Sequence, residues 1–291
     1  MTKWTSADMP DLSGKTVVVT GASSGIGLIA AREMAAAGAH VILAVRDLAK
    51  GRRVAQQMSV AQQMRGIVDV RGLDVSDLAS VRKFADAWTG PLDILVNNAG
   101  VMDIPLERTN DGLDRQTATN SFGPFLLTNL LLPHLTDRVV WVTSQLHRMG
   151  HLRIDDLNWE TRPYNPTDAY SDSKLQVVLF SLELQRRLDA HGSKVRSVLA
   201  HPGIATTSLA AHSSANAINR LSFLLNDPEH GALPTLFAAT QDVPGNAYVG
   251  PNGPLSIKGY PKVRKQGRAG LDPRSASTLW AAVSTLVGVP G

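Results

Sequence analysis

The sequence TVVVTGASSGIG, residues 16–27, joins a run of β-branched residues to a turn with three glycines, and an alanine-rich helical pattern follows it. Glycine lets the backbone turn tightly and approach a ligand closely. The first amides of the following helix lack intrahelical partners and carry positive potential. This order predicts a pyrophosphate site, with an ordinary strand-to-helix turn as the alternative. The predicted phosphate contacts are Gly21, Ser23, Ser24, Gly25, Ile26 and Gly27.

The rest of the chain alternates short apolar runs with longer helical patterns, and no internal repeat is visible. Predicted strands cover residues 16–20, 40–45, 67–72, 94–97, 138–144 and 194–200, with a seventh near 247–249. Predicted helices cover residues 25–37, 48–64, 78–88, 112–135 and 169–190. Such alternation favours a parallel sheet covered on both faces. We expect one α/β domain over residues 1–291, a Rossmann-type doubly wound parallel sheet of about seven strands.

Two segments fit this alternation poorly. Residues 204–225 lack a clear pattern, and we expect them to form a substrate-side lid. Residues 243–291 are rich in proline and glycine, so we expect a loop-rich C-terminal extension.

Composition excludes several functions. The 29 basic and 25 acidic residues are spread along the chain, so we expect no nucleic-acid partner. The absence of cysteine excludes disulfides, thiolate metal sites and thiol catalysis, and is compatible with a reducing cytoplasm. The eight histidines lack metal-ligand spacing, so we expect no metal. No apolar run approaches the ~18 residues of a membrane span, so we expect a soluble, cytoplasmic protein.

The glycine spacing is GxxxGxG, and TGASSGIG resembles the signature of the short-chain dehydrogenase/reductase family. Further motifs follow in that family's order over residues 12–205: Leu73-Asp74-Val75, Asn97-Asn98-Ala99-Gly100, Asn120, Ser144, Tyr170-Ser171-Asp172-Ser173-Lys174 and His201-Pro202-Gly203. Within the family, LVNNAGVM, HRMG, DDLN and KLQVVLFSLELQRRL are most similar to the branch of retinol dehydrogenases and protochlorophyllide reductases. Members of that branch differ in substrate, so the resemblance does not name one.

The resemblance implies a nicotinamide dinucleotide cofactor. It places Asp74 at the adenine ring and Asn98 at the turn near the adenosine. Each has a structural alternative, because Asp74 could cap the helix beginning near Asp77 and Asn97-Asn98 could stabilise a turn. The remaining implied cofactor contacts are Val75, Ala99, Gly100, Tyr170, Lys174, Pro202 and Gly203.

Arg46 decides our expectation about the form of the cofactor. NAD-specific sites commonly end the second strand with an acid that binds the ribose hydroxyls, whereas an arginine accommodates a 2′-phosphate. Here the strand ends in Arg46, and the first acid is Asp47. We therefore expect NADP(H) to be favoured over NAD(H). The alternative is a solvated arginine, and Ser24 supplies no second positive charge in the glycine turn.

Tyr170 and Lys174 are the predicted proton-transfer pair. They lie four residues apart on a predicted helix, so they share one face about one turn apart. Reaction at a carbonyl needs one proton to move and charge on oxygen to be stabilised. A tyrosine with a pKa near ~10 can move that proton when a positive charge stabilises its phenolate.

Ser144 and Asn120 complete the predicted catalytic set. Ser144 ends a predicted strand at the carboxyl edge, where its hydroxyl could hold the substrate oxygen. The resemblance implies that Asn120 holds a water linked to Lys174. The chain departs from the family pattern at Ser121 and at Asp172, whose acid could raise the pKa of Tyr170 or alter the substrate rim. The long connection 145–169 is expected to border the substrate pocket, with a solvated excursion as the alternative.

These residues predict an enzyme that interconverts an alcohol and a carbonyl compound, acting on a small apolar substrate. A reductase of a carbon–carbon double bond and a non-catalytic dinucleotide sensor are the alternatives. Residues 122–135 and 169–188 are apolar around more of the helix than one buried stripe requires. We therefore expect a homodimer or homotetramer through these helices.

Overall fold

The structure, a computed structural model, describes residues 3–61, 64–203 and 227–290. Within them, one eight-stranded sheet has the order β3-β2-β1-β4-β5-β6-β7-β8. The parallel strands are β1 (Thr16–Thr20), β2 (His40–Val45), β3 (Ile67–Gly72), β4 (Leu92–Asn97), β5 (Leu135–Val142), β6 (Arg196–Ala200) and β7 (Tyr248–Pro251). β8 (Pro261–Arg264) runs antiparallel to β7. The predicted parallel sheet is confirmed, with an antiparallel edge strand that was not predicted.

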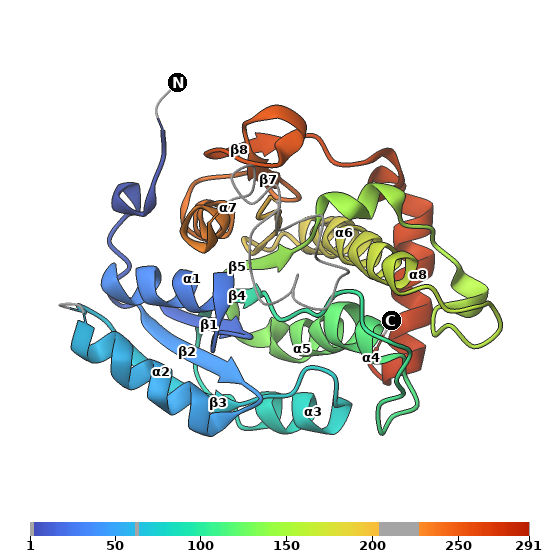
Figure 1. Cartoon of the computed structure of the whole chain (residues 1–291), viewed down its shortest axis with the longest axis horizontal. Helices are drawn as coiled ribbons and strands as arrows, with labels where there is room; N and C mark the ends of the chain where they lie inside the picture. Colours follow the sequence, from blue (N-terminus) through green and yellow to red (C-terminus); the bar gives the residue numbers. More distant parts are fainter. Residues whose placement is uncertain (1–2, 62–63, 204–226, 291) are drawn as a thin grey trace.

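Helices cover both faces of this sheet (Figure 1). One layer contains α1 (Gly25–Ala36), α2 (Leu48–Ala61) and α7 (Pro228–Thr240), and the other contains α3 (Leu78–Asp86), α5 (Gly123–Leu131) and α6 (Pro166–Ala190). In β1, Val17 and Val19 pack in the core on the side of α1, α2 and α7, whereas Val18 packs in the core on the side of α3, α5 and α6. All three side chains are fully buried. A strand buried on both faces needs a continuous apolar run, which VVV supplies.

The topology places the site. From β1 the chain passes to β2 and β3 on one side, and later to β4 and β5 on the other. The loops that leave the carboxyl ends of β1 and β4 therefore diverge at a switch point of the strand order. In doubly wound sheets, ligands bind in the crevice at such a point.

The helix predicted over residues 112–135 is divided in the structure. It consists of α4 (Arg115–Thr117), a π-helical turn η2 (Ala118–Phe122), α5, and a 3₁₀ turn η3 (Leu132–His134), and β5 already begins at Leu135. Pro133 lacks an amide proton and disfavours a helical residue before it, so a regular helix cannot continue there. The continuous apolar pattern concealed this change from helix to strand.

The C-terminal extension, residues 243–291, is more regular than predicted. It contains β7, β8, a 3₁₀ turn η9 (Arg268–Leu271) and the helix α8 (Pro273–Val287). The Asp272 carboxylate caps the first turn of α8, and Gly288 ends the helix with a left-handed backbone (φ 66°). These are ordinary helix signals, and the high proline and glycine content of the segment hid them. The predicted lid, residues 204–225, lies outside the described residues.

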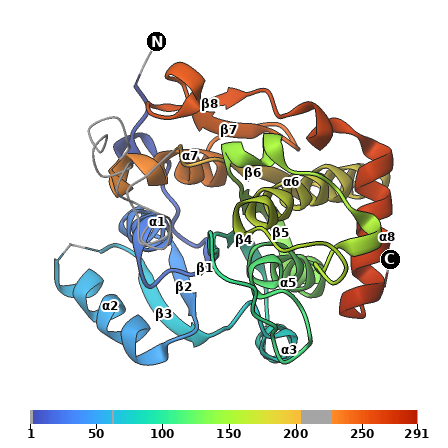
Figure 2. The same ribbon diagram turned by 45° about the vertical axis from the view of Figure 1, so that its right-hand side comes forward.

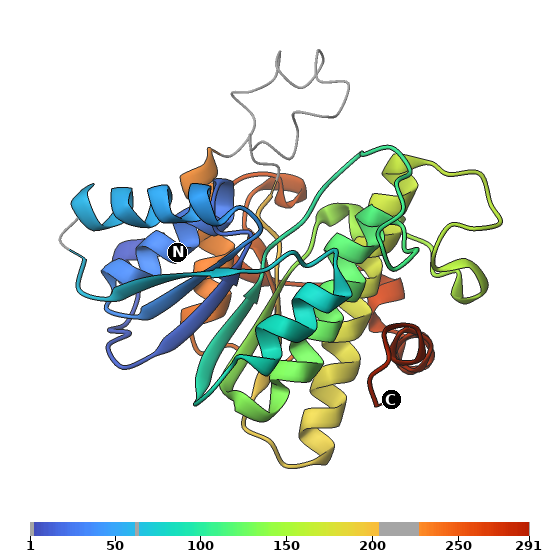
Figure 3. The ribbon, with the colours of Figure 1, turned by 90° about the horizontal axis from the view of Figure 1, so that it is seen from below.

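α8 lies against α6 on the side away from the sheet, as Figures 2 and 3 show. The Trp280 ring is 4.7 Å from the Phe125 ring and 6.4 Å from the Phe180 ring between centroids. The Arg187 guanidinium lies 4.6 Å from the centre of the Trp280 ring. α8 therefore covers part of the apolar surface that was assigned to a second subunit, and the expected oligomer stays a prediction.

None of the helices in the described ranges is long and apolar enough to cross a membrane.

Candidate active site

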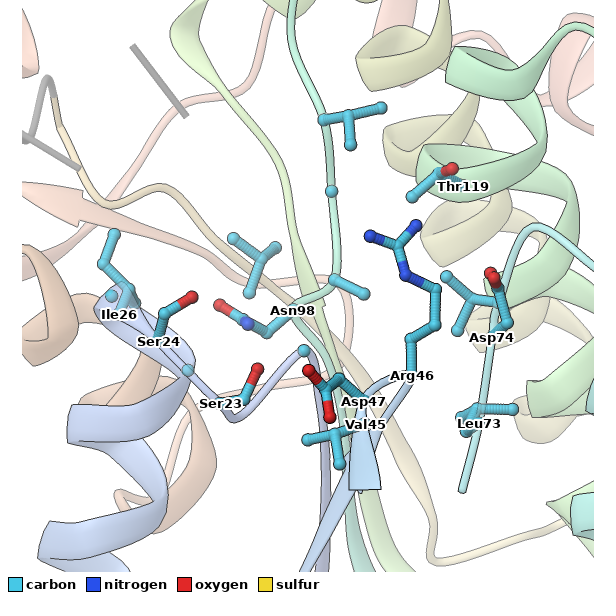
Figure 4. Close-up of a pocket in the computed structure, with 18 of the residues that line it drawn as sticks. Ser23, Ser24, Ile26, Val45, Arg46, Asp47, Leu73, Asp74, Asn98 and Thr119 are labelled. Carbon is cyan, nitrogen blue, oxygen red and sulfur yellow. The ribbon is translucent and has the colours of Figure 1, made fainter. Parts of the chain in front are cut away.

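A cavity of about 480 Å³ opens at the carboxyl edge of the sheet, beside the glycine turn and the start of α1. Its wall includes every predicted cofactor contact except Gly203. Of the predicted catalytic residues, Tyr170 and Lys174 line it, whereas Asn120 and Ser144 do not. Figure 4 shows side chains from the glycine turn, the end of β2 and the loop after β3 facing this space. The lining residues that were not predicted are Val45, Asp47, Lys50, Leu73, Val101, Arg115, Thr119, Val142 and Thr143.

Close packing explains two of the glycines in the turn. Gly21 has φ 67°, and a Cβ there would lie 2.9 Å from the Ala99 Cα. A Cβ on Gly27 would lie 2.2 Å from the Asn98 Nδ2. Ser24 is the N-cap of α1, but its hydroxyl makes no capping hydrogen bond. The first turn of α1 thus has no side-chain cap, which leaves its amides available to an anionic ligand.

Asn98 holds the loop that follows β4 against the end of β1. The Thr20 hydroxyl accepts the amides of Asn98 (3.0 Å) and Ala99 (2.9 Å), and the Asn98 Nδ2 donates to the Thr20 carbonyl (2.9 Å). The structural alternative for Asn98 is therefore realised in this geometry, and Asn98 also lines the cavity. Thr20 was not predicted, although a threonine at a strand end beside the turn was a usable signal.

Asp74 does not cap α3, so that alternative was wrong. Asp77 caps it, since its carboxylate accepts the amides of Ala79 (2.9 Å) and Ser80 (3.2 Å). The Asp74 carboxylate instead accepts the amide and the hydroxyl of Ser76, at 2.9 and 2.7 Å. These bonds fix Asp74 at the cavity wall.

Two positive side chains line the cavity near the end of β2. Figure 4 shows the Arg46 side chain extending between Asp74 on one side and the glycine turn on the other. Lys50 lines the same cavity from the first turn of α2. Between them, Asp47 accepts the Lys50 amide (2.9 Å), and this hydrogen bond holds the pKa of Asp47 below its usual value. Lys50 is thus a second cation that the sequence analysis missed, although its spacing from Arg46 was visible.

Tyr170 and Lys174 are both buried on α6. Burial raises the pKa of Tyr170 to about 12, and a hydrogen bond with the Ser144 side chain opposes that rise. Burial lowers the pKa of Lys174 to about 8. The Lys174 Nζ donates to the Val142 carbonyl (3.1 Å) and lies 5.6 Å from the centre of the Tyr170 ring. At neutral pH the Tyr170 phenol therefore keeps its proton, and the Lys174 amine is mostly protonated and positively charged.

Asn120 lies in the π-helical turn between α4 and α5. Its Nδ2 donates to the Val101 carbonyl (2.9 Å) and to the Ser173 hydroxyl (3.0 Å), while its Oδ1 accepts the Val101 amide (2.8 Å). A Cβ on Gly100 would lie 3.2 Å from the Asn120 Oδ1 and 3.5 Å from the Lys174 Nζ. Asn120, which does not line the cavity, and Lys174, which does, therefore both lie close to Gly100 of the cavity wall.

Ser144 follows β5 by two residues and begins the 3₁₀ helix η4 (Gln145–Met149). Its hydroxyl accepts the Leu146 amide at 3.3 Å, and interacts with Tyr170 as described above. A strand was predicted to run to Ser144, but β5 ends at Val142. The two residues beyond the strand carry Ser144 towards α6.

Asp172 is engaged away from Tyr170. Its carboxylate accepts the His151 amide (2.7 Å) and the Arg162 guanidinium (3.0 Å), while burial raises its pKa. Asp172 is not among the groups that shift the pKa of Tyr170. Part of the connection 145–169 borders a second cavity of about 470 Å³, which shares no lining residue with the first. That this connection borders the substrate pocket stays a prediction.

Comparison with known proteins finds a matching family model and similar sequences and structures. The family model for short chain dehydrogenases matches residues 15–155. Retinol dehydrogenase 13 from Homo sapiens is 38% identical over 96% of this chain and 86% of its own length. A solved but uncharacterised protein from Mycobacterium paratuberculosis is 46% identical with a TM-score of 0.87, covering 99% of this chain and 98% of that one. A protein from Beutenbergia cavernae, described as a putative NAD(P)-dependent gluconate 5-dehydrogenase and solved with NADP at low occupancy, is 27% identical with a TM-score of 0.60, covering 79% of this chain and 91% of that one.

The motifs, the sheet order and these relatives agree. Members of the family bind a nicotinamide dinucleotide and are oxidoreductases. The chain belongs to the short-chain dehydrogenase/reductase family, and within it is most similar to the retinol dehydrogenase branch.

Proposed function

We propose that this protein is an NADP(H)-dependent oxidoreductase that interconverts an alcohol and a carbonyl compound. The observation that carries the proposal is the position of Tyr170 and Lys174, which line the same cavity as the glycine turn. The predicted proton-transfer pair and the predicted pyrophosphate site would thus be parts of one space. A sensor without turnover has no need for this pairing.

The residues of the cavity fit a dinucleotide. The uncapped start of α1 and the close-packed Gly21 and Gly27 would hold the pyrophosphate. Asp74 and Asn98 would border the adenosine, and the volume is in the range of ligand sites. A bound nicotinamide would supply or accept the hydride, which no side chain can do.

The side chains then handle the oxygen and its proton. The Ser144 and Tyr170 hydroxyls would bind the substrate oxygen, and Tyr170 would donate its proton as a carbonyl becomes an alcohol. Because burial raises the pKa of Tyr170 to about 12, the phenol is protonated at neutral pH and suited to reduction. In the opposite direction Tyr170 must first lose that proton, which the Lys174 ammonium favours.

Arg46 and Lys50 support the choice of NADP(H). Both line the cavity at the end of β2, where a 2′-phosphate would be bound. The nearest acid, Asp47, is engaged with the amide of Lys50. Two cations and an engaged acid favour a phosphate over free ribose hydroxyls.

The test is NADPH consumption with a panel of aldehydes, ketones and enones that includes retinal, because a relative is named as a retinol dehydrogenase. Tyr170→Phe keeps the ring but deletes the oxygen that exchanges the proton. Turnover should fall by ~10² to 10⁴, while NADPH affinity and folding change little. If Tyr170→Phe kept more than about a third of the original rate, Tyr170 would not be the acid. Reaction with enones alone would instead favour the alternative function, the reduction of a carbon–carbon double bond.

A further inference from the structure

The motif HRMG, residues 147–150, has no part in the function proposed above. It lies in η4, directly after Ser144. His147 is fully buried, and both of its ring nitrogens have hydrogen-bond partners. A buried histidine with two specific partners is restricted to one orientation and one tautomer.

The first partner of His147 is the peptide of Ser144. The His147 Nδ1 lies 2.6 Å from the Ser144 carbonyl oxygen, and the His147 amide also donates to that oxygen (3.1 Å). A carbonyl can only accept, so the Nδ1 carries the proton. The ring therefore fixes the peptide that carries the Ser144 side chain.

The second partner belongs to the C-terminal extension. The Gly267 amide donates to the His147 Nε2 at 3.0 Å, so this nitrogen is the acceptor of a neutral imidazole. Burial lowers the pKa of His147, which favours the neutral form. A Cβ on Gly267 would lie 3.1 Å from the same Nε2, so the close approach depends on glycine.

Neighbouring bonds join the same two segments. The Arg148 guanidinium donates to the Lys265 carbonyl (2.7 Å), and the Tyr248 hydroxyl donates to the Gln145 side chain (3.2 Å). On the other side of η4, a Cβ on Gly150 would lie 2.4 Å from the Ser171 carbonyl oxygen of α6. η4 is therefore enclosed between α6 and the C-terminal extension.

We propose that His147 is a positioning residue, which holds the Ser144 hydroxyl beside Tyr170 by tying the Ser144 peptide to Gly267 of the C-terminal extension. This inference rests on the proposed function, in which Ser144 and Tyr170 bind the substrate oxygen. The extension thereby helps to build the active site although none of its described residues lines the dinucleotide cavity.

The kinetic test compares His147→Leu, Ser144→Ala and the double variant in NADPH-dependent reduction of an aldehyde from the panel. His147→Leu removes both hydrogen bonds, and kcat should fall ~5- to 10-fold, as for one neutral buried hydrogen bond, with KM for NADPH unchanged. In the Ser144→Ala background, His147→Leu should cause no further loss. His147→Asn can still donate to the Ser144 carbonyl and should retain more activity than His147→Leu.

Arg148→Ala is the matched control, because it removes a bond between the same segments without touching Ser144. It should leave kcat unchanged. An equal loss from His147→Leu with and without Ser144 would mean that His147 stabilises the fold only, and would overturn the proposal. If His147→Leu caused this equal loss and Tyr170→Phe was inactive, the proposed function would still be supported.

A second readout needs no substrate. Only four tyrosines are present, so NMR of protein with isotope-labelled tyrosine can follow the ionisation of Tyr170 in the NADP⁺ complex. Since the bond with Ser144 lowers the pKa of Tyr170, both Ser144→Ala and His147→Leu should raise it, and the double variant should match Ser144→Ala. An unchanged Tyr170 pKa in folded His147→Leu, confirmed with His147→Asn as the milder variant, would refute the positioning role.

Discussion

Arg46→Asp should reverse or abolish the preference for NADP(H). In the unmodified protein, Arg46 extends from β2 into the cavity with Lys50 nearby, and Asp47 is engaged with a backbone amide. A charge-assisted contact contributes ~1.5 to 3 kcal/mol, so NADPH should bind at least about tenfold more tightly than NADH. The new carboxylate should weaken NADPH binding by at least that factor, because it repels a 2′-phosphate.

The assay is the dissociation constant of each cofactor, measured by fluorescence or calorimetry at two salt concentrations. NADH affinity should stay the same or increase in Arg46→Asp, because the new carboxylate can accept hydrogen bonds from the ribose hydroxyls. Lys50→Ala should have a smaller effect, ~1.5- to 5-fold, as expected of an exposed cation. Arg52→Asp is the control, since it makes the same charge change on α2 without lining the cavity. Equal constants for NADPH and NADH in the unmodified protein would refute the reasoning.

Three further predictions concern pH, the core and association. Alcohol oxidation needs the Tyr170 phenolate, so its rate should rise with pH above neutral, because burial raises the pKa of Tyr170, and a flat alkaline profile would contradict the assigned role. Trp280→Ala should lower the free energy of unfolding, measured in urea, by ~3 kcal/mol, the lower end of the range for a buried aromatic residue. The lower end applies because the indole N–H has no hydrogen-bond partner among the described residues, so no hydrogen bond is lost. Trp280→Phe should lower the free energy of unfolding by less. Light scattering at micromolar concentration should report a homodimer or homotetramer, and a monomeric mass would refute the predicted association.

The sequence was sufficient for the elements whose signals are local. The bounds of β1, β2 and β3 are as predicted, because β1 and β2 are short apolar runs and β3 alternates apolar residues with Asp69 and Arg71. The glycine turn and the four-residue spacing of Tyr170 and Lys174 are also local patterns, and the structure brings both to one cavity. Prediction failed where local signals competed, as at Leu135, where an apolar run changes from helix to strand.

Only the tertiary structure decided which distant residues meet. No spacing rule connects His147 to Gly267, which are 120 positions apart, or places Trp280 against Phe125 and Phe180. The pKa directions of Tyr170 and Lys174 likewise depend on burial by segments from several parts of the chain. Periodicity along a sequence specifies an element and its buried face, because side chains repeat with the backbone. Which face meets which is decided by packing and hydrogen bonding between elements, and these depend on the whole fold.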